Sequence, residues 1–247
     1  LHTYMGVYEI RDRDEAVSIM VDKANIAADT IKNNYDCCVA YYDEHLLEIS
    51  IEQRRLLGEF EPALQNDEFV MYLQPQVKRD GAAKGAEALV RWVHPSRGIL
   101  TPYAFIDILE NAGLIYKLDL YIWEKAAQKL AEWKEKGYGS YHISVNISTK
   151  DFYIIDIYET FTGLINKYGI AASNLHLEIT ETTLMTDFEK NMNIIHKLQD
   201  VGFRVEIDDF GSGYSSLNML KDISADVLKI DMGFLRKSEN EVKGQDI

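Results

Sequence analysis

Cysteine is almost absent from this chain of 247 residues. The two cysteines, Cys37 and Cys38, are adjacent, so they offer neither a disulfide framework nor the spacing of a cysteine metal site. The chain also has no signal peptide and no apolar run long enough to span a membrane. These absences favour a reducing, cytoplasmic setting, with any membrane anchor carried by parts of the parent protein that this chain lacks.

Basic residues are also few compared with acidic ones. The chain has 26 lysines and arginines and 40 aspartates and glutamates, so its formal net charge is −14. Such a chain has no general electrostatic attraction for nucleic acid polymers or for anionic membranes. It can still bind a phosphorylated ligand where metal ions and a few basic groups lie in the site. The chain begins at Leu1 rather than at methionine, so we expect it to be a piece of a longer protein.

The spacing of apolar residues predicts three parts, at residues 1–43, 44–66 and 67–247. The first part contains two short strands, Gly6–Ile10 and Cys37–Tyr42, and a helix at Asp14–Asn33. The second part is a charged amphipathic helix, Glu44–Gln65, which we interpret as a linker rather than a packing helix or a coiled-coil arm.

The third part alternates strands with helices, which is typical of a largely parallel sheet with crossover helices. The predicted strands are Phe69–Val77, Lys84–Trp92, His142–Ser148, Leu175–Thr180, Arg204–Phe210 and Asp226–Asp231. The predicted helices are Pro102–Ala112, Leu118–Lys136, Asp151–Tyr168, Asp187–Val201 and Ser215–Leu220. A short turn around Arg79-Asp80-Gly81 joins the first two strands, so we expect that pair to be antiparallel.

One face of these strands is repeatedly polar, as where Ser144 and Asn146 alternate with Ile143 and Val145. Strands covered by helices on both faces of an open parallel sheet should instead be almost continuously apolar. An open sheet with one solvent-exposed face is the alternative, but the many crossover helices make it less favoured. We therefore expect a (β/α) barrel whose interior is polar near the carboxyl ends of its strands, where barrel active sites lie.

Asp208 and Asp209 are adjacent carboxylates at the end of a predicted strand, followed by a glycine-rich loop. Alone, this pattern is as typical of a turn or a helix N-cap as of a metal site. In the barrel, however, Glu87, Asn146 and Glu178 converge with them and offer only oxygen ligands, which suit Mg²⁺, Mn²⁺ or Ca²⁺. Two metals that share a carboxylate, about 3.5–4 Å apart, suit phosphodiester hydrolysis.

Two basic residues lie on the same inward faces, Lys229 and Arg91. Lys229 can hold a nucleophilic water or stabilise transition-state charge, and Arg91 can bind a phosphate in a bidentate manner. Each polar residue taken alone also has an ordinary structural explanation. Asn146 can be a hydrogen-bonded core amide, and Lys229 can be a structural ion-pair partner.

Six motifs, in order from about Phe69 to the end of the chain, resemble those of EAL domains. They are Tyr72-Leu73-Gln74-Pro75, Glu87-Ala88-Leu89-Val90-Arg91-Trp92 with His94-Pro95, Ser144-Val145-Asn146-Ile147-Ser148, Leu177-Glu178-Ile179-Thr180-Glu181-Thr182, Asp208-Asp209-Phe210-Gly211-Ser212-Gly213-Tyr214-Ser215-Ser216 and Leu228-Lys229-Ile230-Asp231. Residues 1 to about 45 resemble, less specifically, the end of a GGDEF (diguanylate cyclase) domain. The Gly-Gly-Asp-Glu-Phe signature itself is absent, so no cyclase activity can be assigned.

The EAL resemblance implies a TIM-like (β/α) barrel with one antiparallel strand, and metal-dependent hydrolysis of cyclic di-GMP to linear pGpG. It implies two ions, Mg²⁺ or Mn²⁺, in bacterial second-messenger signalling. The implied ligands are Glu87, Asn146, Glu178 and Asp208 for the first metal and Asp209 for the second. It also implies a homodimer formed through the loop at Phe210–Ser216.

The resemblance assigns further roles by motif position. Lys229 matches the lysine that holds the catalytic water, and Glu181 matches the glutamate that anchors the loop after Asp209. The implied substrate contacts are Gln74, Leu89 and Arg91. All these positions carry the residue types of an active member.

The family's motifs continue beyond Lys229, with a strand that ends in a metal-binding glutamate and then a glutamine near the substrate. This chain stops at Ile247, before both, and contains six of the eight strands that a closed barrel needs. Unpaired edge strands are a liability, so we expect the isolated chain to be poorly stable and nearly inactive. A non-catalytic cyclic di-GMP receptor is therefore the alternative function, especially for this truncated chain.

Overall fold

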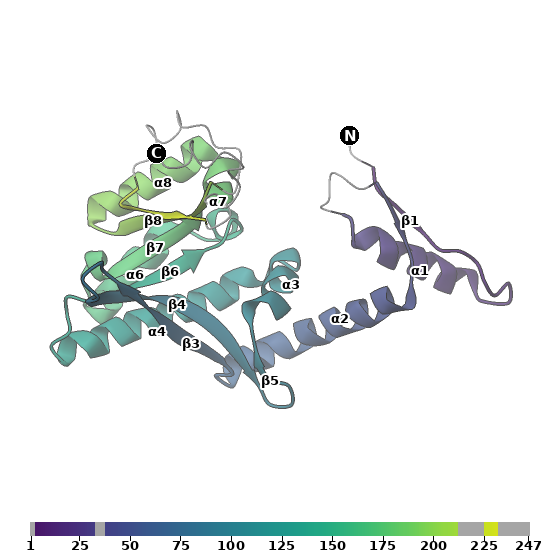
Figure 1. The fold of residues 1–247 in the computed structure, drawn as a ribbon, viewed down its shortest axis with the longest axis horizontal. Helices are drawn as coiled ribbons and strands as arrows, with labels where there is room; N and C mark the ends of the chain where they lie inside the picture. The colour runs from purple at the N-terminus through teal and green to yellow at the C-terminus, as the bar shows by residue number, and fades with distance from the viewer. Residues whose placement is uncertain (1–2, 33–37, 212–224, 232–247) are drawn as a thin grey trace. The chain divides into compact units, whose positions relative to one another are not determined.

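The computed structural model describes residues 3–32, 38–211 and 225–231 (Figure 1). The chain divides into two compact units, Leu1–Pro62 and Ala63–Ile247. The helix predicted at Ser215–Leu220 and most of the loop at 210–216 lie outside the described residues.

The first unit is a strand–helix–strand element. Its strands β1 (Met5–Val7) and β2 (Val39–Tyr41) pair in parallel, and α1 (Val17–Asp29) packs on both. The three elements confirm the predicted order, although each is shorter than expected. The long helix α2 (Glu44–Gln65) has the predicted bounds and continues past the end of this unit.

Among its described residues, the second unit has a mixed sheet of seven strands, in the order β3-β4-β6-β7-β8-β9 with β5 paired to β4. Its strands are β3 (Phe69–Val77), β4 (Ala83–His94), β5 (Gly98–Leu100), β6 (His142–Ile147), β7 (Leu175–Thr180), β8 (Arg204–Phe210) and β9 (Val227–Ile230). The β3–β4 pair is antiparallel, as expected, and the pairings from β4 through β6, β7 and β8 to β9 are parallel. Gly81 closes the β3–β4 turn at φ +83°, a conformation that favours glycine.

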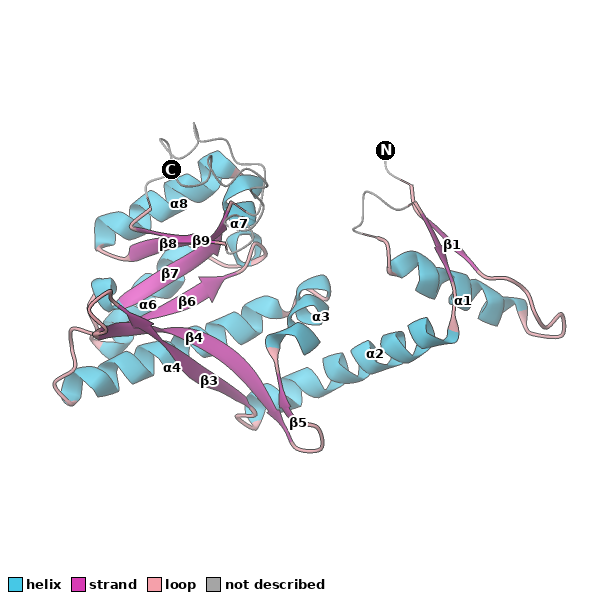
Figure 2. Cartoon of the chain, viewed as in Figure 1, coloured by secondary structure: helices cyan, strands magenta, loops and turns pink. Residues whose placement is uncertain are grey.

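The described helices follow the predicted order, with two differences: one predicted helix is divided, and a short helix directly after β7 was not predicted (Figure 2). They are α3 (Ile106–Asn111), α4 (Ile115–Glu135), α5 (Asp151–Ile154), α6 (Ile157–Tyr168), α7 (Glu181–Thr186) and α8 (Phe188–Val201), with 3-10 turns η1 (Pro102–Ala104) and η2 (Ala172–Asn174). The single helix predicted over Asp151–Tyr168 is wrong, because Ile155 is extended and Asp156 starts a new helix. The Asp156 side chain accepts a hydrogen bond from the Glu159 amide, as an N-cap does.

The apolar face of the sheet forms the core against the crossover helices. Val145, Leu177 and Val205 are fully buried on this face. Trp123 of α4 packs against Phe161 of α6, and its indole donates a hydrogen bond to the Asn146 carbonyl at 2.9 Å. The helices are thereby fixed to the strands that carry the polar residues on the opposite face.

The opposite face is polar and is buried as well, because the sheet curls. Three strands separate β4 from β9 in the sheet, and neighbouring strands lie about 4.8 Å apart, so a flat sheet would hold them roughly 19 Å apart. Yet Lys229 on β9 and Glu87 on β4 form an ion pair of 2.9 Å. Within the described residues the sheet remains open, with β3 and β9 at its two ends.

Candidate active site

Three carboxylates surround one ammonium group on the inner face of the curled sheet. Lys229 donates to Glu87 Oε2 at 2.9 Å and to Glu178 Oε1, and its Nζ lies 4.0 Å from Glu206 Oε2. Burial disfavours the charged lysine, but its hydrogen bonds to Glu178 and Glu87 and the negative charge of the carboxylate cluster outweigh this and raise the pKa of Lys229 above its ordinary value. The lysine therefore stays charged, and the site is built to hold positive charge.

Glu178 and Glu206 are neighbours across the β7–β8 pairing. Their Oε2 atoms are buried, and no described side chain outside this pair donates a hydrogen bond to either atom. Burial, together with a hydrogen bond from carboxyl to carboxylate, raises the pKa of Glu178 to about 9. Burial acts against ionisation of Glu206 too, but hydrogen bonds from His176 and Glu178 lower its pKa to about 2. The proton thus belongs to Glu178.

A chain of polar contacts supports Glu206 from the amino-terminal side of the strands. His176 Nδ1 lies 2.6 Å from Glu206 Oε1, and the Ser144 hydroxyl donates to the same oxygen at 3.3 Å. The His142 ring stacks on His176 at 3.8 Å, and its Nε2 lies 2.8 Å from Gln76 Oε1. Burial and the neighbouring His176 lower the pKa of His142 to about 4. The inner face is therefore hydrogen-bonded from β3 through to β8.

The proton on Glu178 makes the stability of the metal-free protein depend on pH. Because the pKa of Glu178 rises from 4.5 to about 9 on folding, the folded state binds an extra proton between these values. We therefore expect the free energy of unfolding to decrease as the pH rises through this window. Urea unfolding between pH 5 and 9 measures it, with Glu178→Gln as the matched control that should flatten the dependence. A stability that rises over this range in both proteins would contradict the assignment.

The other predicted metal ligands lie at the carboxyl ends of the same strands. Asn146 is exposed and is the cross-strand neighbour of Glu178, and Asp208 is half-buried and pairs with Thr180. Asp209 is exposed, and burial together with the charges of Asp208 and Asp231 raises its pKa. The structure therefore brings Glu87, Glu178 and Lys229 into direct contact and places the remaining acids next to them.

Asp209 has an unusual backbone conformation that favours its own residue type. Its φ is +54°, and the β8–β9 pairing is irregular between Ile207 and Phe210. Aspartate and asparagine tolerate this left-handed region better than other non-glycine residues. The irregularity turns the end of β8 toward Gly211, whose amide donates to Glu181 Oε2 at 2.8 Å. This is the contact that the loop-anchoring role of Glu181 requires.

We expect Asp209→Asn to remove the negative charge of the side chain while it keeps the backbone conformation of residue 209. Asparagine keeps the size and tolerates φ +54°, so the melting temperature should stay close to the wild-type value. Loss of the carboxylate that the sequence predicts as a metal ligand should reduce the hydrolysis expected from the EAL resemblance by about 10²-fold or more. Asp209→Ala is the comparison, because it should lose activity and about 1 kcal/mol of stability as well. Equal destabilisation by both variants would count against the conformational argument.

The predicted substrate residues lie along the β3–β4 hairpin. Gln74 pairs with Glu87, and Leu89 pairs with Tyr72. The Arg91 guanidinium lies over the Tyr72 ring, 5.7 Å from its centroid, and donates to the Val90 carbonyl at 2.7 Å. Gln74 is exposed, whereas Leu89 and Arg91 are half-buried. These side chains form a strip that leads away from the carboxylates.

Sequence reasoning assigned no role to the residues beneath the carboxylates. Glu206 contacts both His176 and Lys229, and none of these contacts was predicted. The available signal was the strand parity, because Glu206 is two residues before Asp208 and therefore shares its face. What the sequence could not show is the pairing register that sets Glu206 beside Glu178.

The arrangement fits a divalent cation at Glu87 and Glu178. The donors there are oxygens, Glu178 has a buried oxygen without a donor, and a cationic ammonium already lies between the two carboxylates. A second group, His142, His176 and Glu206, has ligand atoms within 4.8 Å of one another. The rings of its two histidines are parallel within 2°, so one ion cannot lie in both ring planes.

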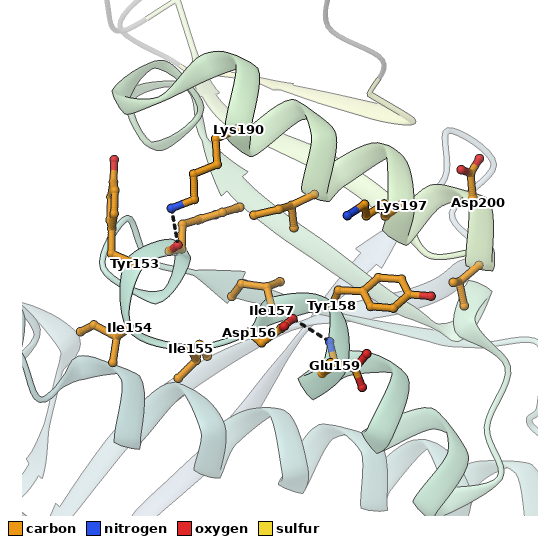
Figure 3. A pocket seen from close by; sticks show the side chains of 13 residues that line it. Tyr153, Ile154, Ile155, Asp156, Ile157, Tyr158, Glu159, Lys190, Lys197 and Asp200 are labelled. Atoms are coloured by element: carbon orange, nitrogen blue, oxygen red, sulfur yellow. Dashed lines mark hydrogen bonds between the residues drawn. The ribbon is translucent and has the colours of Figure 1, made fainter.

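A large groove lies away from this site, between α5, α6 and α8 (Figure 3). It encloses about 820 Å³, and none of the predicted site residues lines it. Lys190 crosses one end, where its Nζ donates to the Phe152 carbonyl at 3.1 Å and lies over the Tyr153 ring. The candidate chemistry is therefore on the inner face of the sheet, not in this groove.

Comparison with known proteins identifies the family. Residues 58–247 match the EAL domain family, and the chain therefore belongs to it. Among curated relatives, it is 33% identical over 212 residues to the bifunctional diguanylate cyclase/cyclic di-GMP phosphodiesterase MucR of Pseudomonas aeruginosa. It is 31% identical over 185 residues to the cyclic di-GMP phosphodiesterase PdeR of Escherichia coli.

These matches cover 85% and 75% of this chain but 30% and 28% of the relatives, so the chain spans about a third of their length. A solved structure of the PaMucR phosphodiesterase in complex with c-di-GMP is similar in fold, with a TM-score of 0.71 and 33% identity. That match covers 78% of both chains. Within the described residues, no helix combines the length and the apolar character needed to cross a membrane.

Proposed function

We propose that this chain carries the active site of a phosphodiesterase that hydrolyses cyclic di-GMP to linear pGpG with two divalent ions, Mg²⁺ or Mn²⁺. The observation that carries the proposal is the meeting of Glu87, Glu178 and Lys229 from strands that the sheet order separates. The family match and relatives with this printed activity support it. The complete fold we propose is a TIM-like barrel, closed by strands beyond those described.

The proposed ligands are Glu87, Asn146, Glu178 and Asp208 for one ion and Asp209 for the other. Bound ions would activate a water and offset phosphate charge. Lys229, which stays positively charged, holds that water and stabilises the negative charge that develops on the phosphate. The proton on Glu178 leaves when its carboxylate becomes a ligand, because carboxylates bind metal in the ionised form.

The substrate lies along the β3–β4 strip in this proposal. Arg91, already oriented by Tyr72 and by the Val90 carbonyl, binds a phosphate, and Leu89 and Gln74 contact the dinucleotide. Glu181 holds the backbone after Asp209 through the Gly211 amide. The loop at 210–216 is also proposed as a homodimer contact.

We further propose that residues 1–43 are the end of a GGDEF domain and that residues 44–66 link it to the EAL part at 67–247. The strand–helix–strand order of β1, α1 and β2 is consistent with this. We also propose that the protein acts in the cytoplasm.

Hydrolysis of cyclic di-GMP by the full-length protein, with Mg²⁺ or Mn²⁺, tests the function directly. Wild-type protein should produce pGpG, and Glu87→Ala should lose at least about 10²-fold of this activity. Glu189→Gln on the exposed face of α8 is the control and should keep full activity. Tight binding of cyclic di-GMP without turnover in the wild type would instead support the alternative, a non-catalytic receptor.

A further inference from the structure

Lys229 has three carboxylates around it, and only two of them are proposed metal ligands. Glu87 and Glu178 are the residues that a metal ion would engage, whereas Glu206 is the third, with Oε2 at 4.0 Å from Nζ. When Glu87 and Glu178 bind an ion, that cation competes with the lysine for both of its hydrogen-bond acceptors. Because the Lys229 side chain is already 23% exposed, its ammonium group can then turn toward solvent.

The side chain of Glu206 is held in one orientation by its neighbours. Its Oε1 is held by His176 and Ser144, and its side chain is only 3% exposed. His176 is itself held by the stacked ring of His142, which Gln76 orients. Gly85 leaves room for that ring, since a Cβ at this position would lie 2.3 Å from His142 Nε2. The carboxylate is therefore oriented by four strands and keeps Oε2 turned toward the site.

We propose that Glu206 is a positioning residue that holds the Lys229 ammonium in the active site once Glu87 and Glu178 are engaged by a metal ion. The inference rests on the proposed function, in which Lys229 holds the water. Its basis is geometric: Glu206 Oε2 is buried, receives no hydrogen bond from a described side chain outside the Glu178–Glu206 pair, and lies 4.0 Å from Nζ. A charged lysine next to a metal ion needs such a counter-charge, because otherwise repulsion and solvation draw it outward.

The decisive variant is Glu206→Gln in the full-length protein. Glutamine keeps the size of the side chain and can still accept the His176 hydrogen bond, but it removes the negative charge. A purely structural role would therefore survive the change. We expect kcat for cyclic di-GMP to fall by about 10- to 100-fold, as for other residues that orient metal-site groups. KM and the Kd for Mn²⁺, measured by calorimetry, should change much less than kcat.

A second readout does not depend on turnover. Acetylation of Lys229 by an amine-reactive ester, which reacts with the deprotonated amine and releases its alcohol, followed by mass spectrometry, reports how accessible the end of this side chain is. Without metal, Glu87 and Glu178 hold the lysine in both proteins, and labelling should be equally slow. With saturating Mn²⁺, Lys229 should be labelled faster in Glu206→Gln than in wild type. Glu189→Gln removes the same charge from an exposed position and should match wild type throughout.

Several results would overturn the proposal. Wild-type kcat and unchanged Lys229 labelling in Glu206→Gln with Mn²⁺ would show that Glu206 does not hold the lysine. Loss of Mn²⁺ binding itself would make Glu206 a metal ligand instead. If wild-type protein binds Mn²⁺ but does not hydrolyse cyclic di-GMP, the proposed function fails while the labelling comparison still decides the role of Glu206. If Glu206→Gln does not fold, Glu206→Asp can be used in its place, because aspartate keeps the charge but holds it at a greater distance from Lys229. We expect the labelling rate of Lys229 in Glu206→Asp to be intermediate. A labelling rate as slow as in the wild type would contradict the proposal.

Discussion

Glu178→Gln is expected to remove cyclic di-GMP hydrolysis without weakening the fold. In the metal-free protein the Glu178 carboxyl is protonated, because burial and Glu206 raise its pKa to about 9. Glutamine has nearly the same shape and is neutral, so the buried site loses no charge that it needs for folding. Hydrolysis should nevertheless fall by about 10³-fold, because a neutral amide binds a divalent ion more weakly than the carboxylate that it replaces.

Two measurements on the same preparation separate these effects. Urea unfolding at pH 7 without metal should give Glu178→Gln a free energy of unfolding equal to or above the wild-type value. Mn²⁺ should then stabilise the wild type and have little effect on the variant, since a ligand stabilises only the state that binds it. A variant that is strongly destabilised without metal would show that Glu178 is ionised there, contrary to its assigned proton.

Lys229→Met, unlike Glu178→Gln, is expected to lose stability as well as activity. The substitution leaves Glu87, Glu178 and Glu206 together without the cation that now lies among them. Removing one partner of a buried ion pair costs about 3–5 kcal/mol, and we expect the lower end because the lysine side chain is 23% exposed. Hydrolysis should fall by about 10²-fold or more, since the charge that stabilises the transition state is lost.

A divalent ion should restore the stability of Lys229→Met but not its activity. Mn²⁺ supplies the missing positive charge to Glu87 and Glu178, so the melting temperature of the variant should rise more than that of the wild type. Lys125→Met is a suitable control, because it removes a lysine whose ion pair with Asp67 is exposed. If Mn²⁺ raises all three melting temperatures equally, the carboxylates around Lys229 are not where the ion binds.

Much of the fold could be predicted because its signals are local. Strand Phe69–Val77 and helix Glu44–Gln65 have the predicted bounds, since each is a continuous stretch of one periodicity. The break within Asp151–Tyr168 was missed because the helical pattern of apolar residues continues on both sides of it. A single residue, Asp156, ends that continuity by acting as the N-cap of a new helix. The short strand β5 was also missed, because its three residues are too few to show a period.

The sequence by itself determined which residues are available for the chemistry. Strand parity put Glu87, Glu178, Asp208 and Lys229 on inward faces, and six ordered motifs indicated the family, because both depend only on spacing along the chain. The tertiary structure decided which of them meet. The curl of the sheet brings β9 to β4, and the β7–β8 register sets Glu206 beside Glu178. These contacts join residues far apart in the chain, so no local pattern specifies them, and they decide where the proton and the lysine's charge reside.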